Sequence, residues 1–301
     1  MTDVAHDEDG GKEGGPAVTA ASGAGVTSTE TVFDADLGFA IDTVQRAGVV
    51  LMDRYERLER IRHKSPKDVV TEADHLSEEL IIASVQAHSP GDGVLAEESG
   101  EHRLASGAAA TAGAGRVWVV DPLDGTVNYA NGIPFFCVSI ALVIDGRPVV
   151  GVVHDPTRDE VFSATAGGPA LLADRATPGG RPIEASDKAK MSDFVVSLAL
   201  SGRAVATRIR RIRKEIRISR SMGAAALALA YVGNGRFDAF IQSAGLSSWD
   251  IAAAGLIAER AGAAVSDLAG GPWFDLARKP NAIGVLAAPV AHHGAFLDLV
   301  R

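Results

Sequence analysis

The chain has 301 residues, of which 47% are hydrophobic, and its 29 Lys and Arg against 38 Asp and Glu give a formal net charge of −9. Its one cysteine, Cys137, excludes a disulfide framework, so we expect a cytoplasmic protein that relies on apolar packing. The acidic balance argues against a nucleic-acid partner. The short apolar runs and the acidic N-terminus argue against a membrane span and a secretory signal.

The first part of the chain predicts a tail followed by helices. Residues 1–30 are mostly Gly, Ala, Ser, Thr and acidic residues without an apolar period, which predicts a disordered tail. Residues 33–62 carry apolar side chains at helical spacing and predict an amphipathic helix. A second helix is expected over residues 72–88, because Ser89-Pro90-Gly91 stops it. The Gly- and Ala-rich residues 100–115 are typical of a flexible loop or a hairpin insertion.

The middle of the chain has the pattern of a β-meander, and the second half alternates strands with helices. Strands are expected at 117–120, 135–144, 149–154, 160–164, 194–198, 215–219, 237–241 and 281–287. Helices are expected at 203–213, 222–232 and 249–261, with one more closing the chain. A meander followed by alternating elements predicts two layered subdomains that share a cleft.

The strongest chemical signal is the sequence Asp121-Pro122-Leu123-Asp124-Gly125-Thr126. We expect Pro122 to end the preceding strand and Gly125 to permit a tight turn. Asp121 and Asp124 would then enter one site, where two close carboxylates repel each other unless a cation separates them. Oxygen ligands of this kind favour Mg²⁺. A turn in which aspartates cap the local backbone explains the motif equally well when it is considered alone.

Three other acidic groups occupy comparable positions. Glu97 and Glu98 follow a short apolar run, and Asp250 opens an Ala-rich helix. Asp68 and Asp74 flank a β-branched segment, where a plain helix cap is the competing explanation, and an ordinary helix cap also competes for Asp250. A helix N-terminus such as the one at Asp250 also favours a nearby phosphate through its exposed N–H groups.

These motifs together resemble the Mg²⁺-dependent, lithium-sensitive inositol monophosphatase family over residues 33–300. The motifs are Asp68-Val69-Val70-Thr71-Glu72-Ala73-Asp74, Ala96-Glu97-Glu98-Ser99, Asp121-Pro122-Leu123-Asp124-Gly125-Thr126-Val127-Asn128-Tyr129 and Trp249-Asp250-Ile251-Ala252-Ala253-Ala254-Gly255. The resemblance implies one domain over residues 31–301, an α+β or α/β sandwich with α-β-α-β-α layers. It divides into a metal-binding α+β half (31–185) and an α/β half (186–301). It also implies two or three Mg²⁺ ions, a small phosphorylated substrate and a homodimer.

The resemblance also implies a set of metal ligands. Glu97, Asp121 and the Leu123 carbonyl would hold one Mg²⁺, while Asp121, Asp124 and Asp250 would hold a second. Two cations about 3.5–4 Å apart stabilise both the attacking and the leaving oxygen of an in-line displacement. We therefore expect hydrolysis by metal-activated water, without a covalent phospho-enzyme.

Water activation and phosphate binding are implied for neighbouring positions. Thr126 with Glu97 would position and deprotonate the attacking water. Glu98 and Asp74 would support this shell or a third ion. The backbone N–H groups of Gly125 and Thr126 would contact the phosphate at a helix N-terminus.

The remaining implied positions concern the substrate. Lys64 lies where the family has a mobile-loop lysine, and Asp68 supports the acidic motif around it. Gly223 and Ala225 match small residues that let the backbone approach the substrate. Ser243 stands where these enzymes have a glutamate that binds substrate hydroxyls, a departure that puts inositol itself in question.

Several functions stay open on the sequence. The same ligand shell serves inositol 1-phosphate, fructose 1,6-bisphosphate, histidinol phosphate and adenosine 3′,5′-bisphosphate, and a non-catalytic regulatory protein could use the same fold. A haloacid-dehalogenase-type phosphatase does not fit, because its nucleophilic carboxylate would fall at Pro122.

The basic segment from Arg203 to Arg220 is typical of a solvated helix face or a subunit contact. Alternatively, it could bring an arginine to a second phosphate.

Overall fold

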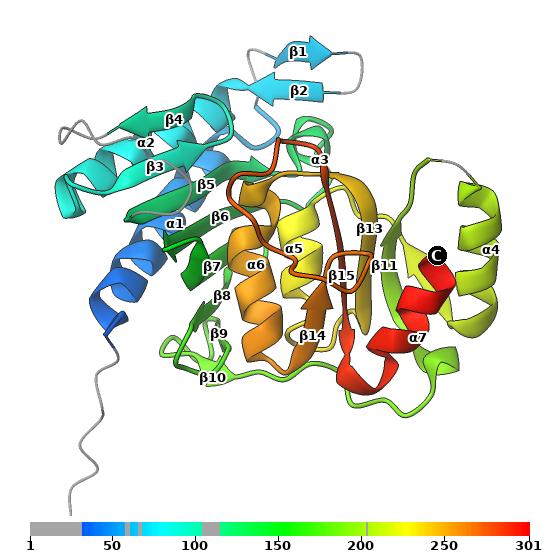
Figure 1. Cartoon of the computed structure of the whole chain (residues 1–301). Coiled ribbons are helices and arrows are strands. Elements are labelled where there is room, and N and C mark those ends of the chain that lie inside the picture. Colours follow the sequence, from blue (N-terminus) through cyan, green and yellow to red (C-terminus); the bar gives the residue numbers. More distant parts are fainter. Residues whose placement is uncertain (1–31, 58–60, 66–67, 104–114, 203) are drawn as a thin grey trace, which may run out of the picture. The chain divides into compact units, whose positions relative to one another are not determined.

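A computed structural model describes residues 32–57, 61–65, 68–103, 115–202 and 204–301 (Figure 1). The expected tail at residues 1–30 and most of the expected loop at 100–115 lie outside this part of the chain. Among the described residues, no helix is both long and apolar enough to cross a bilayer.

The larger sheet has eight strands and carries the first half of the chain. In spatial order they are β10 (Arg181–Pro182), β9 (Leu171–Ala173), β8 (Glu160–Thr165), β7 (Arg147–Asp155), β6 (Cys137–Ile144), β5 (Arg116–Asp124), β3 (Gly93–Ala96) and β4 (Gly100–Arg103). Only β3 and β5 pair in parallel, and all other neighbours are antiparallel. The meander expected from the sequence therefore forms most of this sheet.

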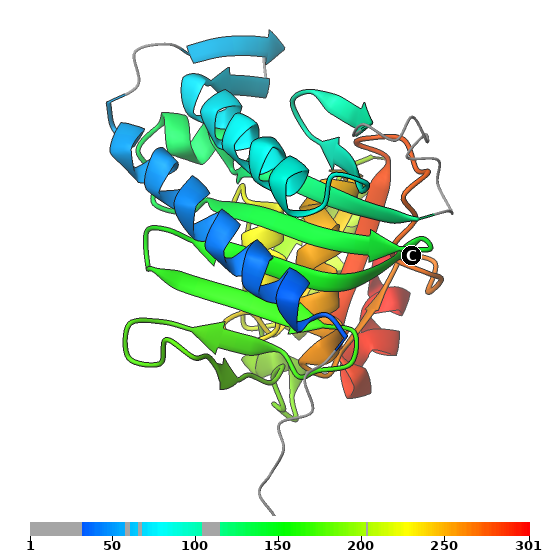
Figure 2. The same ribbon diagram turned by 90° about the vertical axis from the view of Figure 1, so that its left-hand side faces the viewer.

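Helices cover both faces of the larger sheet. The two helices α1 (Asp34–Arg54) and α2 (Glu72–His88) pack on one face, across β5, β6 and β7 (Figure 2). On the other face lie α5 (Ala225–Ala230) and α6 (Ser248–Arg260), both almost wholly buried. Their Ala-rich sequences let the helices lie close to the sheet, because alanine adds little volume beyond the backbone.

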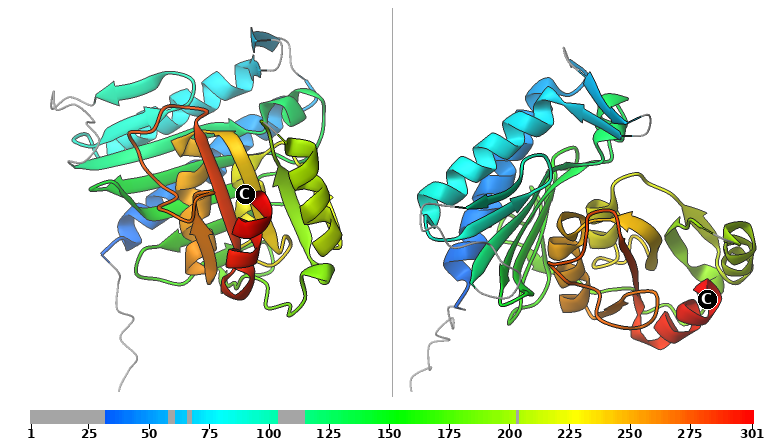
Figure 3. Two further views of the ribbon diagram at one scale, coloured as in Figure 1. Left: turned by 45° about the vertical axis from the view of Figure 1, so that its right-hand side comes forward. Right: turned by 45° about the horizontal axis from the view of Figure 1, so that its top comes forward.

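The smaller sheet lies beyond α5 and α6 (Figure 3). Its order is β12 (Ile218–Arg220), β11 (Val195–Ala199), β13 (Ala239–Leu246), β15 (Ile283–Pro289) and β14 (Ala263–Ser266). The helices α4 (Val205–Glu215) and α7 (Val290–Val300) contact each other and form the last layer. The order of layers is thus α-β-α-β-α, which confirms the layered fold expected from the sequence.

Three short elements complete the described chain. A two-stranded ribbon is formed by β1 (Ile61–Ser65) and β2 (Asp68–Thr71), directly before α2. The helix α3 (Thr126–Ala130) follows β5, and the 3₁₀ turn η1 (Met191–Asp193) precedes β11.

The first helix is shorter than its apolar pattern predicts. It ends at Arg54 rather than near residue 62, because Tyr55 is extended and Glu56 has a positive φ of 62°. The Tyr55 ring still packs on Tyr129 and Phe136, at ring-centroid distances of 5.5 and 5.1 Å. Tyr55, one of the apolar residues behind the prediction of a longer helix, therefore makes its contacts from the turn that follows α1.

Pro122 does not end its strand, which corrects the expectation from the sequence. Opposite β6, Asp121 pairs with Ser139 and Asp124 pairs with Cys137, so β5 contains one extra residue and forms a bulge. The missing N–H of proline is tolerated at a bulge because the ladder is already interrupted there. In a regular strand, two residues three apart face opposite sides of the sheet, and the bulge lets Asp121 and Asp124 meet.

The close contact between β7 and α6 yields a stability prediction. A Cβ added at Gly151 would lie 2.7 Å from the backbone oxygen of Ala253, so Gly151→Ala should destabilise the protein by about 1–3 kcal/mol. Gly294, in α7, has nothing within 4 Å of such a Cβ, and Gly294→Ala should stabilise by about 0.5–1 kcal/mol. Urea unfolding of both variants tests the contact, and equal shifts would contradict it.

Candidate metal centre and active site

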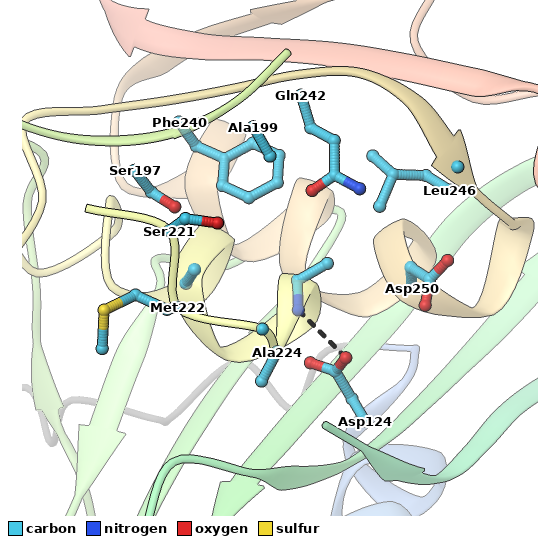
Figure 4. A pocket seen from close by; sticks show the side chains of 14 residues that line it. Asp124, Ser197, Ala199, Ser221, Met222, Ala224, Phe240, Gln242, Leu246 and Asp250 are labelled. Atoms are coloured by element: carbon cyan, nitrogen blue, oxygen red, sulfur yellow. Dashed lines mark hydrogen bonds between the residues drawn. The ribbon is translucent and has the colours of Figure 1, made fainter. Parts of the chain in front are cut away.

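Three carboxylates from two distant segments meet between the sheets. Asp121 and Asp124 come from the bulged end of β5, and Asp250 comes from the first turn of α6. One oxygen of each lies within 4.8 Å of the others. Figure 4 shows Asp124 and Asp250 facing the same hollow from different elements.

Local hydrogen bonds fix each of these side chains. Asp250 completes a capping box at the start of α6, where its Oδ2 accepts from the Ser247 N–H at 2.6 Å. Asp124 accepts the N–H groups that open α5, from Ala225 at 2.9 Å and Ala226 at 2.8 Å. Capping, the plain explanation for Asp250, is therefore real, but it uses one oxygen only.

Asp121 is the least satisfied member of the group. Its Oδ1 accepts from the Leu123 N–H at 3.1 Å, whereas its buried Oδ2 has no hydrogen-bond partner among the described residues. A buried carboxylate oxygen without a donor or a cation is costly. A divalent cation between these carboxylates would satisfy this oxygen and offset their mutual repulsion.

The pKa values of the three aspartates are all raised, chiefly by burial. Burial, and then the charges of Glu97, Asp124 and Asp250, raise the pKa of Asp121 well above its usual range. Burial is also the main cause that raises the pKa of Asp124 to about 6 and that of Asp250 to about 8. The all-oxygen donor set fits a hard divalent cation, which would relieve both the burial cost and the repulsion.

Thr126 links this group to α2. Its hydroxyl lies 3.0 Å from Asp74 Oδ1 and 3.0 Å from the Leu123 carbonyl, and its single proton can serve only one of them at a time. The other Asp74 oxygen accepts from the N–H and the hydroxyl of Thr71 and so caps α2. Burial raises the pKa of Asp74 to about 6.

Glu97 and Glu98 follow β3 on the other side of Asp121. Both line a cavity of about 640 Å³ together with Ser248 and Trp249. Among the described carboxylates, the group that meets within 4.8 Å holds the three aspartates and not Glu97, although the charge of Glu97 acts on Asp121. Glu97 therefore lies near Asp121 without belonging to the group of three aspartates.

A second cavity, of about 280 Å³, opens beside Asp124 and Asp250 (Figure 4). Gly223 and Ala225 line it, as the sequence predicts for small substrate-facing residues. The Ala225 N–H, however, is already donated to Asp124. Gly223 has a positive φ of 78°, and a Cβ there would lie 3.1 Å from the Asn128 side chain, so the turn requires glycine.

Ser243 is not among the residues that line this cavity. Its hydroxyl accepts from the Ser201 N–H at 2.8 Å, and the neighbouring Gln242 lines the cavity instead. The pairing of β13 with β15 is irregular between Gln242 and Leu246, so the two neighbours lie where the strand departs from regular geometry. The assignment of Ser243 to substrate binding stays a prediction.

Asn128 is a further residue that the sequence analysis missed. Its side-chain NH₂ donates to the Phe135 carbonyl at 2.7 Å and to the Met222 carbonyl at 2.8 Å. These hydrogen bonds connect α3, which begins at Thr126, to the turn that contains Gly223. The signal available in the sequence was that Asn128 lies within the motif that runs from Asp121 to Tyr129.

Some expected site residues are not tested by the geometry. The side chains of Lys64 and Asp68 lie outside the described part of the chain, as does Arg203. The rest of the basic segment forms α4 and β12, and none of its described residues lines the cavity beside Asp124. One of them, Arg217, pairs with Asp193 at 2.9 Å.

Comparisons with known proteins agree with the motifs. The model of the inositol monophosphatase family matches residues 34–301. An inositol-1-monophosphatase of Mesorhizobium japonicum is 36% identical over 78% of this chain and 86% of its own length. A fructose-1,6-bisphosphatase/inositol-1-monophosphatase of Thermotoga maritima is 33% identical, with 78% and 85% covered. A protein of Pseudomonas aeruginosa named Nus factor SuhB is 35% identical, with 79% and 87% covered.

The fold also matches solved structures. The extragenic suppressor protein SuhB of Bartonella henselae superposes with a TM-score of 0.78 and 31% identity. The match covers 89% of this chain and 99% of that protein.

The raised pKa values lead to a prediction about pH and metal. These carboxyls bind protons more tightly in the folded chain, so between pH ~4 and about 8 the folded state holds more protons than the unfolded state. The stability of the metal-free protein should therefore fall as the pH rises through this window. Mg²⁺ needs ionised ligands, so its stabilising effect should grow in the same direction.

Thermal unfolding in EDTA and in Mg²⁺ across this pH range tests the prediction. At a Mg²⁺ concentration of about 100 times its Kd, the expected gain at pH 8 is about 2.7 kcal/mol, or a rise in Tm of about 4–5 °C. A gain that is equal at pH 5 and pH 8 would contradict the assignment of the cluster.

Proposed function

Because the chain belongs to the inositol monophosphatase family, we propose that it is a Mg²⁺-dependent phosphomonoesterase that hydrolyses a small phosphorylated polyol or sugar of the inositol 1-phosphate type. The observation that carries this proposal is the buried group of Asp121, Asp124 and Asp250 with its unpartnered Asp121 oxygen. A protein that had kept only the fold would have no physical reason to keep three repelling carboxylates in its interior.

The metal ligands in this proposal are Asp121, Asp124 and Asp250 for one ion, and Glu97, Asp121 and the Leu123 carbonyl for another. When bound, Mg²⁺ would supply positive charge to the phosphoryl oxygens and lower the pKa of the attacking water. The bulge in β5 supports this sharing, because it brings two aspartates from one strand to one place.

The chain's own residues would orient the reactants. The Thr126 hydroxyl, 3.0 Å from Asp74, would hold the attacking water together with Glu97, and Glu98 would support this shell. The backbone N–H groups of Gly125 and Thr126, where α3 begins, would contact the phosphate. The phosphoryl transfer then needs positioning and charge neutralisation and no protein nucleophile.

The cavity beside Asp124 and Asp250 would receive the leaving group. Ser197, Ser221 and Gln242 offer neutral polar groups there. No Lys or Arg is among the described residues that line it, which favours an uncharged hydroxylated leaving group over one with a second phosphate.

Two other functions have a specific observation behind them. The Thermotoga maritima relative is named for fructose-1,6-bisphosphatase activity as well, so a sugar bisphosphate is the second candidate substrate. The SuhB-named relatives raise a regulatory role beside or instead of catalysis. Lithium inhibition, the presence of Mg²⁺ itself and a homodimer are extended to this chain from its family and are part of the proposal.

Asp121→Asn separates the metal function of this carboxylate from stability. The amide cannot replace a shared anionic ligand, so phosphate release should fall about 100-fold or more, since metal charge contributes several kcal/mol. Removing one buried negative charge should at the same time raise the Tm of the metal-free protein at pH 8. Phosphate release and Tm, measured on the same preparation, test both.

Asp238→Asn is the matched control. Asp238 is equally buried but is paired with Lys188 at 2.8 Å, so its variant should lose stability and keep its phosphate release. Wild-type activity in Asp121→Asn, or the trapping of a covalent phospho-enzyme in the wild type, would contradict the proposal.

A substrate panel tests the leaving-group assignment. Inositol 1-phosphate should be hydrolysed with a higher kcat/KM than fructose 1,6-bisphosphate or adenosine 3′,5′-bisphosphate, because the cavity offers no cation to a second phosphate. Mg²⁺-dependent phosphate release, measured with and without lithium, gives the ranking. A bisphosphate that ranks first would overturn the assignment of the cavity.

A further inference from the structure

One face of α2 carries three buried polar side chains. Asp74, Ser77 and Glu78 follow the spacing i, i+3 and i+4, so they lie on one side of the helix. Their exposed fractions are 0%, 0% and 4%. A helix that only covers a sheet would bury apolar residues at these positions, so each of these side chains calls for a physical explanation.

Ser77 acts on the bulge in β5. Its hydroxyl donates to the Pro122 carbonyl at 2.9 Å. Pro122 lies inside the bulge, where neither it nor Leu123 has a ladder partner on β6. The Ser77 hydroxyl thus supplies a donor to a carbonyl that the sheet leaves unpaired. It also fixes the peptide bond that joins Pro122 to Leu123.

Glu78 acts on the segment after β3. Its carboxylate accepts the Glu98 N–H at 2.9 Å and also the hydroxyl of Ser99. Both donors directly follow Glu97 in the chain. Among the described residues, no Lys or Arg pairs with Glu78, so its charge is stabilised by these donors rather than by an ion pair.

This arrangement is poor for stability and useful for positioning. A buried carboxylate without a cation costs free energy, and Glu78 is only 4% exposed. Its two hydrogen bonds, however, hold the Glu98 backbone N–H and the Ser99 hydroxyl, and so restrict where the preceding Glu97 side chain can lie. Ser77, one residue earlier, holds the β5 backbone that carries Asp121.

We propose that Ser77 and Glu78 are positioning residues that keep Glu97 and Asp121 in place to bind one cation. The inference rests on the proposed function, because it concerns the same metal centre. Asp74, at the start of the same face, contacts Thr126, so one helix face touches residues 121–126 at two points and the segment after β3 at a third. Supporting partners of this kind typically change metal affinity or activity 10–100-fold when they are removed.

Mg²⁺ titration of the metal-free protein by calorimetry tests the inference without any activity measurement. In Glu78→Gln, an NH₂ group replaces one of the two accepting oxygens and faces a donor. The Kd for Mg²⁺ should therefore rise about 10-fold or more. Ser99→Ala removes one of the two contacts and should give a smaller rise. At saturating Mg²⁺, the KM of Glu78→Gln for substrate should stay within about twofold of wild type, because Glu78 touches no substrate.

Glu160→Gln is the matched control. Glu160 is a buried glutamate (6% exposed) that pairs with Arg236 and Arg158, and it belongs to no part of the site. Its variant should lower the Tm and leave the Kd for Mg²⁺ unchanged. Hydrogen exchange of the backbone at residues 97–99, measured without metal, should accelerate in Glu78→Gln and not in Glu160→Gln.

The possible outcomes separate the positioning role from the metal centre itself. If the wild type binds Mg²⁺ and Glu78→Gln binds it with the same Kd, the positioning role is overturned and the metal centre stands. An equal loss of affinity in Glu160→Gln would mean that general destabilisation explains the effect, which also overturns the role. A wild type that binds no Mg²⁺ would overturn the proposed function together with this inference.

Discussion

The mutual repulsion of Asp121, Asp124 and Asp250 governs how the surrounding elements are arranged. Three carboxylates with oxygens within 4.8 Å of each other, two of them in almost fully buried residues, form a group that no apolar core would tolerate without compensation. Part of the compensation is visible in the protein, as backbone N–H groups from the first turns of α5 and α6. In our proposal a bound cation supplies the rest, because the second Asp121 oxygen has no hydrogen-bond partner among the described residues.

In the layered fold, the ends of several strands and helices lie together around these carboxylates. The strand β5 ends between the two sheets, α5 and α6 begin there, and the segment after β3 reaches it from the side. Helix N-termini suit carboxylates because their N–H groups and dipoles favour negative charge. The helix α2 contributes in a different way, because its buried polar face holds the backbones that carry two of the acidic segments.

The sequence predicted the parts of this site that depend on local chemistry and on motif resemblance. The α2 boundaries at residues 72–88, the meander and the acidic motifs belong to this class. Features set by long-range partners were missed. The bulge at Pro122 depends on the register of β6, and the contact of Glu78 with Glu98 joins residues 20 apart. The place of Gln242 beside the cavity was not predicted, because it depends on the irregular pairing of β13 with β15.

Crystals soaked in Mn²⁺, a divalent ion with a measurable anomalous signal and the same preference for oxygen ligands, would show whether these carboxylates bind a cation. We predict an anomalous peak within coordination distance of Asp121, Asp124 and Asp250, with the second Asp121 oxygen as one of its ligands. A map without a peak there at saturating Mn²⁺, with the three carboxylates still held together, would show that the protein satisfies its buried charges by another means.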